Sequence, residues 1–149
     1  MTQNLAQKVD EQFCDGYCCS EAIVIATTEL YAPNVSKELA QAASSGLCGG
    51  MGGKKATCGV FTGGAVAIGL VLGKGTKKDK RIKKLSALYY QQLEQHAGGQ
   101  ICQQLLDKMG IMNWNGSRCR RLTKDGGTLL QTILETELSH IESHTETDN

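Results

Sequence analysis

The stretch ATCGVFTGGAVAIGLVLG, residues 56–73, decides the fold class that the sequence predicts. Its eighteen residues carry no charge, and Lys55 and Lys74 stand at its two ends. The length reaches the lower limit for a membrane span, but five glycines and two threonines make it a poor one. A helix that is apolar on every side is typical of the interior of a helical bundle. We therefore expect a central apolar, Gly-rich helix and no membrane span.

Helical spacing of apolar residues continues before this stretch, without strand-like alternation. Asp15 is placed to cap a helix that starts near Tyr17, and Pro33 ends that helix. Ser36 is placed to cap a shorter helix. The first thirteen residues are polar and are not assigned to a helix.

The second half also has helical spacing, in a segment ending at about residues 96–98, in a short segment at 101–109 and in a long one at 117–141. Gly126 and Gly127 are expected to bend or break the last helix. The predicted fold is therefore all-α: a compact, single-domain bundle of five to six helices over residues 1–149. An acidic tail is expected to fray from about residue 142.

Composition narrows the class of protein. The chain has 149 residues, a net charge of +1, and no linker or repeat that would divide it. No global field therefore points to nucleic acid or to a membrane. The N-terminus lacks the apolar segment of a secretory signal, so we expect a cytoplasmic protein with reduced thiols.

Cysteine is the residue type that most strongly suggests chemistry. The sequence contains no CxxC and no CxxCH, which argues against a thioredoxin-type pair and covalent haem. The spacing also differs from common ferredoxin and zinc-finger motifs. If the cysteines act together, the fold must gather them from distant segments. The seven are Cys14, Cys18, Cys19, Cys48, Cys58, Cys102 and Cys119.

The stretch GLCGGMGGKK, residues 46–55, superficially suggests a phosphate-binding loop. In the P-loop pattern a glycine would replace Cys48, and serine or threonine would replace Lys55. We therefore expect no nucleotide. The glycines instead predict a sharp turn with positive φ angles.

Three features favour a thiolate at Cys58: a position in the first turn of the long helix, and the neighbours Lys54 and Lys55. Cys119 lies among arginines, which favours a thiolate there too. The alternative is that each cysteine is a small core residue. Cys102 illustrates it, because this residue shares a helix face with leucines.

Four segments carry a family resemblance: CCSEAIV (18–24), TCGVFTGGAVAIGLVLG (57–73), ICQQLL (101–106) and RCRRL (118–122). Over about residues 13–134 the chain resembles the C_GCAxxG_C_C family of redox-active proteins, which is named for four cysteines. The resemblance implies that the family cysteines are Cys19, Cys58, Cys102 and Cys119. Val60 stands where the family has alanine, and Cys14, Cys18 and Cys48 are additional to the pattern.

The resemblance implies a redox role, and three chemistries stay open. A related arrangement resembles the iron–sulfur part of a multihaem cytochrome, which favours an iron–sulfur cluster on the four family cysteines. In a metal-free thiol–disulfide oxidoreductase or sensor, Cys58 would attack, and Cys18, Cys19 or Cys48 would resolve the mixed disulfide. A Zn or Cu(I) module is the third alternative. Cys14, Cys18 and Cys48 could add ligands or resolving thiols.

Two features suggest protein partners. The basic run KGTKKDKRIKK, residues 74–84, would suit docking of an acidic redox protein. No aromatic residues alternate with these charges, which argues against nucleic acid. The small residues Gly59, Gly63 and Ala67 are four apart, so another helix could approach closely along this line, and a homodimer is one possibility.

Overall fold

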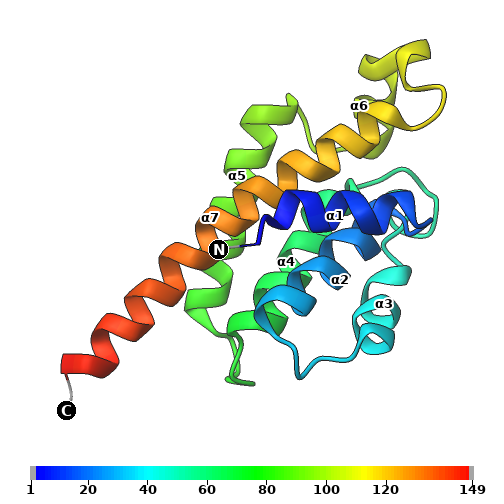
Figure 1. Ribbon diagram of the computed structural model, residues 1–149. Coiled ribbons are helices and arrows are strands. Elements are labelled where there is room, and N and C mark those ends of the chain that lie inside the picture. Colours follow the sequence, from blue (N-terminus) through cyan, green and yellow to red (C-terminus); the bar gives the residue numbers. More distant parts are fainter. Residues whose placement is uncertain (1–2, 148–149) are drawn as a thin grey trace.

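The protein is described by a computed structural model over residues 3–147 (Figure 1). This part of the chain forms seven α-helices, one short 3-10 helix and no strand. The all-α class is confirmed, whereas the expected five to six helices is one or two too few. No helix in the described range is long and apolar enough to cross a membrane. The helices are α1 (Leu5–Cys14), α2 (Cys19–Tyr31), α3 (Lys37–Ser45), α4 (Gly59–Leu72), α5 (Lys80–Ala97), α6 (Cys102–Met109) and α7 (Ser117–Thr147), and the 3-10 helix η1 spans Gly110–Asn113.

Helix α1 is the element that the sequence did not predict. Asn4 caps it by accepting a hydrogen bond from the Gln7 amide. Its polar composition conceals a narrow apolar stripe, Leu5, Ala6 and Val9, which is buried. This stripe packs against α2 and α7. Tertiary packing on one side is therefore enough to hold a largely polar helix.

The start of α2 also differs from the prediction. Asp15 ends α1 and does not cap α2. Cys18 is the N-cap, and Glu21 accepts a hydrogen bond from the Cys18 backbone amide at 3.1 Å. This is a capping box with cysteine in the place of serine or threonine. The helix consequently begins at Cys19, two residues later than expected.

The small residues of α4 face α2. A Cβ added at Gly59 would lie 3.2 Å from the Ser20 Cβ, and one at Gly63 would lie 3.0 Å from the Ser20 backbone. The predicted close approach of another helix is thus confirmed, and that helix belongs to the same chain. This face of α4 is buried within the chain, and a homodimer stays a prediction.

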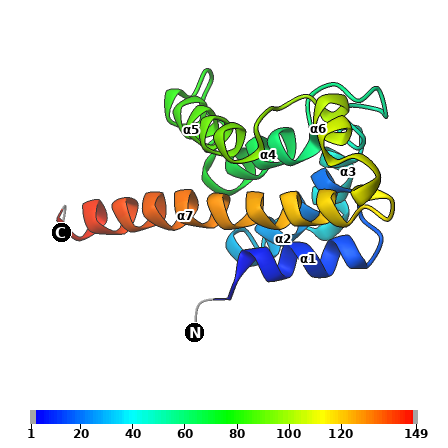
Figure 2. The same ribbon diagram turned by 90° about the horizontal axis from the view of Figure 1, so that it is seen from above.

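Helix α7 is continuous through Gly126 and Gly127, contrary to the expected bend or break. A Cβ at Gly126 would lie 2.4 Å from Val60, and one at Gly127 would lie 3.3 Å from the Ala6 backbone. The absence of a side chain at these glycines allows neighbouring helices to pack closely against α7. This packing compensates for the low helix propensity of glycine. Figure 2 shows α7 between α1 and α5, with its C-terminal turns extending past the other helices. The helix reaches Thr147, and the fraying of the tail stays a prediction.

The Gly-rich loop between α3 and α4 turns sharply, as predicted. Five consecutive residues, 49–53, have positive φ angles, and four of them are glycine. The loop then pairs with the start of α6 through an isolated bridge between Thr57 and Ile101. The Cys58 amide donates to the Gln100 carbonyl at 2.8 Å, and the Cys102 amide donates to the Ala56 carbonyl at 2.6 Å. This pairing fixes the starts of α4 and α6 beside each other.

Candidate functional site

One cavity of about 40 Å³ is lined by the four cysteines that match the family pattern. Its volume exceeds the roughly 10–15 Å³ that a single water requires on this measure. The other lining residues are apolar: Gly59, Val60, Leu105, Leu106, Met109 and Leu122. The cavity thus brings together thiols from four segments that are far apart in the sequence.

Each of the four cysteines stands at the beginning of a helix. Cys19 and Cys102 are the first residues of α2 and α6, and Cys58 is the N-cap of α4. Cys119 is the third residue of α7. The N-terminus of a helix carries partial positive charge and unpaired amide donors. Four such ends therefore converge on one cavity, an arrangement that favours negative charge on the sulfur atoms.

Cys19 and Cys58 affect each other's ionisation more than any other groups in the cavity do. The Cys58 thiol has the largest effect on the pKa of Cys19, and the backbone amides of Ser20, Cys19 and Gly59 act in the same direction. The hydrogen bond from Cys58 and these amides lower the pKa of Cys19 to about 7, although burial opposes the shift. The lowered pKa makes Cys19 the more readily ionised thiol of the pair.

The expected thiolate at Cys58 is wrong for the metal-free site. The pKa of Cys58 is raised by its hydrogen bond to Cys19, by burial and by the negative charge on Cys19. Its position at the start of α4 does not outweigh these three effects. Lys55 lowers the pKa of Cys102 instead, although burial and the charges on Cys19 and Cys119 raise it overall.

The thiolate expected at Cys119 is also wrong for this state. Burial and then the charge of Cys19 raise the pKa of Cys119, against a hydrogen bond from Asn113 that lowers it. Arg120 does not assist, because its guanidinium makes two hydrogen bonds to Asp10, at 2.6 and 2.8 Å. The neighbouring arginines, Arg118 and Arg121, are exposed.

The spacing of the sulfur atoms limits which metals the cavity fits. In the described part of the chain, no three of the four family sulfurs lie within 4.8 Å of one another. A single tetrahedral Zn with bonds of about 2.3 Å requires sulfurs about 3.8 Å apart. A core of several iron and sulfide atoms holds its cysteines farther apart. The four thiols are donors that both kinds of centre use, and as they stand no three of their sulfurs are spaced for a single tetrahedral ion.

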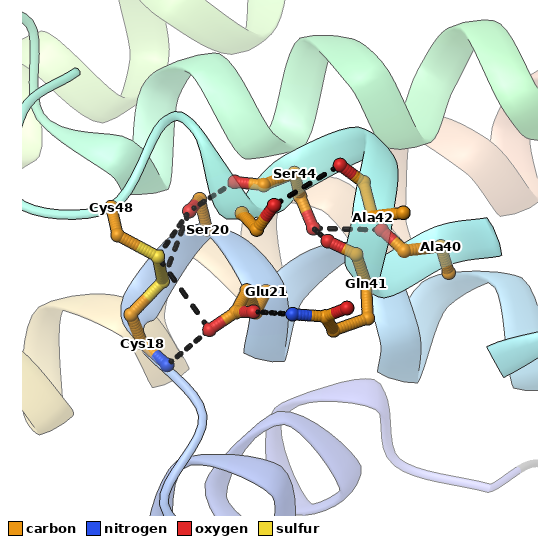
Figure 3. Close-up of a disulfide and its surroundings, with 9 residues drawn as sticks. Cys18, Ser20, Glu21, Ala40, Gln41, Ala42, Ser44 and Cys48 are labelled. Carbon is orange, nitrogen blue, oxygen red and sulfur yellow. Dashed lines mark hydrogen bonds between the residues drawn. A yellow bond between two sulfur atoms is a disulfide. The ribbon is translucent and has the colours of Figure 1, made fainter. Parts of the chain in front are cut away.

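The three additional cysteines lie outside this cavity. Cys14 is exposed at the end of α1. Cys18 and Cys48 form a disulfide with a Cα–Cα distance of 5.8 Å, which ties the start of α2 to the Gly-rich loop (Figure 3). The expectation that all the thiols would be reduced is therefore wrong for this pair. The two residues are thirty positions apart, and only the fold brings them together.

Some residues at the site carried no clear signal in the sequence. Asn113, in η1, donates to the Cys119 sulfur at 3.2 Å and accepts hydrogen bonds from the Arg118 and Cys119 amides. Asn113 therefore both caps α7 and positions the Cys119 side chain. The Met109 sulfur lies 3.9 Å from the Cys119 sulfur. Glu21, beside the disulfide, could have been found from the C-x-x-E spacing of its capping box.

One of the comparisons with known proteins finds a match. No curated protein and no solved structure matches the chain. The model of one protein family does match, over residues 17–133, and its description is "Putative redox-active protein (C_GCAxxG_C_C)". Because this match covers most of the chain, the protein belongs to the C_GCAxxG_C_C family.

Proposed function

We propose that the protein is an electron-transfer or redox-sensing protein that holds an iron–sulfur cluster on Cys19, Cys58, Cys102 and Cys119. One observation carries the proposal: thiols from four helix starts line a single apolar cavity. When bound, a cluster would supply a site that accepts and releases single electrons. No substrate is required for such a role.

The raised pKa values of the thiols support the binding of a positively charged metal centre in the cavity. The pKa values of Cys58, Cys102 and Cys119 are all raised, in part because the negative charge of Cys19 opposes a second thiolate nearby. Four thiolates in one pocket repel one another unless a cation compensates them. Coordination to iron would remove this repulsion, and binding would release protons from the thiols.

The protein's own groups would set the properties of the site. Amides at the start of α2 and at Gly59 donate to the Cys19 sulfur, and Asn113 donates to the Cys119 sulfur. Hydrogen bonds to ligand sulfurs stabilise the more negative, reduced state and so raise a reduction potential. Leu105, Leu106 and Leu122 line the same cavity with apolar surface.

A metal-free thiol–disulfide function is the second candidate, because the structure contains a disulfide and a hydrogen-bonded thiol pair. In this alternative the lowered pKa of Cys19 makes Cys19, and not Cys58, the attacking thiolate. A Zn or Cu(I) module is the third candidate. Within the described residues no three of the family sulfurs lie within 4.8 Å of one another, so a single ion in that cavity would require them to move closer together.

An electron-transfer role requires a partner protein that donates or accepts the electron. The 74–84 run follows α4, whose fourteen residues separate it from Cys58 by about 20 Å of helix. Arg118 and Arg121 line a groove that shares Met109 and Leu122 with the cysteine cavity. We therefore propose that an acidic partner protein binds nearer to these arginines than to residues 74–84. A cytoplasmic location also stays a proposal.

Purification without oxygen, followed by iron and acid-labile sulfide analysis, tests the proposal. We expect a coloured protein whose iron content falls by more than half in Cys58→Ser and in Cys102→Ser. Cys14→Ser is the matched control, because Cys14 is exposed and lies outside the cavity. Wild-type protein that stays colourless and iron-free after reconstitution would refute the cluster. Equal iron loss in Cys14→Ser would refute the assignment of ligands.

A further inference from the structure

The Cys18–Cys48 disulfide lies beside a carboxylate that the proposed cluster does not use. Glu21 Oε1 is 3.5 Å from the Cys48 sulfur, and Figure 3 shows the carboxylate directed toward the disulfide. The Cys18 and Cys48 sulfurs and a Glu21 oxygen all lie within 4.8 Å of one another. Two soft donors and one hard donor therefore meet at one point, outside the four-cysteine cavity.

Glu21 is buried, with only 9% of its surface exposed. Its oxygens accept hydrogen bonds from the Cys18 amide at 3.1 Å and from the Gln41 side chain at 2.5 Å. Within residues 3–147, none of the ion pairs with lysine or arginine involves Glu21. Burying a carboxylate without a cation costs free energy that two neutral donors offset only in part. A cation bound next to Glu21 would therefore offset the cost of burying this carboxylate.

We propose that reduction of the Cys18–Cys48 disulfide creates a Zn²⁺ site whose ligands are Cys18, Cys48 and Glu21. In a tetrahedral site with Zn–S of about 2.3 Å and Zn–O of about 2.0 Å, sulfur and oxygen ligands are about 3.5 Å apart. The Glu21–Cys48 separation already equals this value. Cys48 lies in the Gly-rich loop, between Gly46 and Gly49, which can absorb the opening of the S–S bond. A water molecule would complete the coordination.

The reaction balances with a dithiol as the reductant. A dithiol supplies two electrons and two protons, its own sulfurs form a disulfide, and the Cys18–Cys48 bond becomes two thiols. Zn²⁺ then binds both sulfurs and releases their two protons to solvent. In the oxidised protein the same sulfurs are bonded to each other and cannot bind the metal. The site therefore binds zinc only in the reduced state.

Neighbouring side chains support the ligands. Gln41 donates to Oε2 of Glu21, whereas Oε1, which accepts from the Cys18 amide, is the oxygen directed at the sulfurs. The Ser20 hydroxyl donates to the Ser44 carbonyl and lies 3.2 Å from the Cys18 sulfur. Such outer contacts fix the orientation of metal ligands. They join α2, α3 and the loop around one point.

The capping box alone could explain Glu21, and one substitution separates the two roles. Glutamine at this position retains a side-chain oxygen for the Cys18 amide, so Glu21→Gln keeps the cap. It removes the charge that would bind zinc. Glu38→Gln is the matched control, because Glu38 is an exposed acidic residue in the first turn of α3.

Zinc binding to the full chain tests the inference, by titration of Zn²⁺ against a chromophoric chelator. We expect reduced wild type to bind one more equivalent than Cys18→Ser/Cys48→Ser, and oxidised wild type to match that double variant. Because the result is a difference, it does not depend on what the four family cysteines bind. In Glu21→Gln, the affinity for this additional equivalent should fall at least tenfold, with no change in Glu38→Gln.

Two results would overturn the inference. The first is equal stoichiometry and affinity in reduced wild type and the double serine variant. The second is an unchanged affinity in Glu21→Gln, with helical content and unfolding midpoint like those of wild type, which would leave Glu21 as a cap only. A failure of the iron proposal would instead appear as iron-free protein and would leave these zinc comparisons unaffected.

Discussion

At the scale of single residues, the site depends on how many donors reach each sulfur. Three backbone amides lower the pKa of Cys19, whereas one, that of Val60, lowers the pKa of Cys58. Both cysteines stand at a helix start, so the helix dipole does not distinguish them. Gly59 accounts for part of the difference, because its amide faces Cys19 and a Cβ there would lie 2.7 Å from the Cys19 sulfur.

The pH dependence of alkylation follows from this asymmetry. In the reduced, metal-free protein, the thiolate fraction of Cys19 should rise through a midpoint near pH 7, since its pKa is lowered to about 7. Burial and the charges on Cys19 and Cys119 raise the pKa of Cys102, so its midpoint should lie well above that of Cys19. Iodoacetamide rates for each cysteine, measured by peptide mass spectrometry from pH 6 to 10, check this. A higher midpoint for Cys19 than for Cys102 would contradict the assignment.

At the scale of helices, α4 is held by close contacts at its glycines. Gly64 faces Tyr89 of α5, and a Cβ there would lie 2.1 Å from the Tyr89 ring. Tyr89 is fully buried and donates a hydrogen bond to the Val60 carbonyl at 2.7 Å. Gly126 of α7 lies against the same tyrosine, so α4, α5 and α7 meet at this side chain.

Gly64→Ala should therefore destabilise the fold by about 1–3 kcal/mol, because the added methyl group overpacks a core in which the Tyr89 ring cannot easily move. Gly69→Ala, in the same helix, has nothing within 4 Å of its Cβ position. It should stabilise the protein by about 0.5–1 kcal/mol through helix propensity alone. Urea unfolding monitored by circular dichroism measures both. Equal changes in the two variants would contradict the packing assigned to Gly64.

The elements show what the sequence could and could not predict. The cap at Ser36, the helix end at about residues 96–98 and the positive φ angles of the Gly-rich loop rest on local chemistry, and the structure confirms them. Whether a glycine breaks a helix depends on its neighbours. Gly126 and Gly127 meet side chains of distant helices, so their role was not readable from local sequence.

The candidate site, like the helices, could be predicted only in part. The family resemblance implied which four cysteines belong together, and one cavity is lined by all four. The ionisation of Cys58 and Cys119 depends on burial and on Cys19, neither of which a linear sequence displays. The Cys18–Cys48 pair was missed because the expected reducing compartment argued against any disulfide, and thirty residues separate the two.

At the scale of the whole molecule, the disulfide closes a loop that contains α2 and α3. A loop of this length corresponds to about 3–4 kcal/mol of stabilisation in the chain-entropy description. We expect Cys18→Ser/Cys48→Ser to lose about this much relative to oxidised wild type in urea unfolding. Reduction of wild type should remove the difference, and Cys14→Ser should unfold like wild type. A double variant as stable as the oxidised protein would contradict this contribution.

X-ray absorption at the iron edge tests directly whether four helix starts hold a multi-iron core. The sample is wild-type protein purified or reconstituted without oxygen. We expect an iron environment of sulfur atoms only, with a second shell from neighbouring iron. Iron surrounded by nitrogen or oxygen ligands, or by sulfur without any iron neighbour, would contradict a cluster on Cys19, Cys58, Cys102 and Cys119.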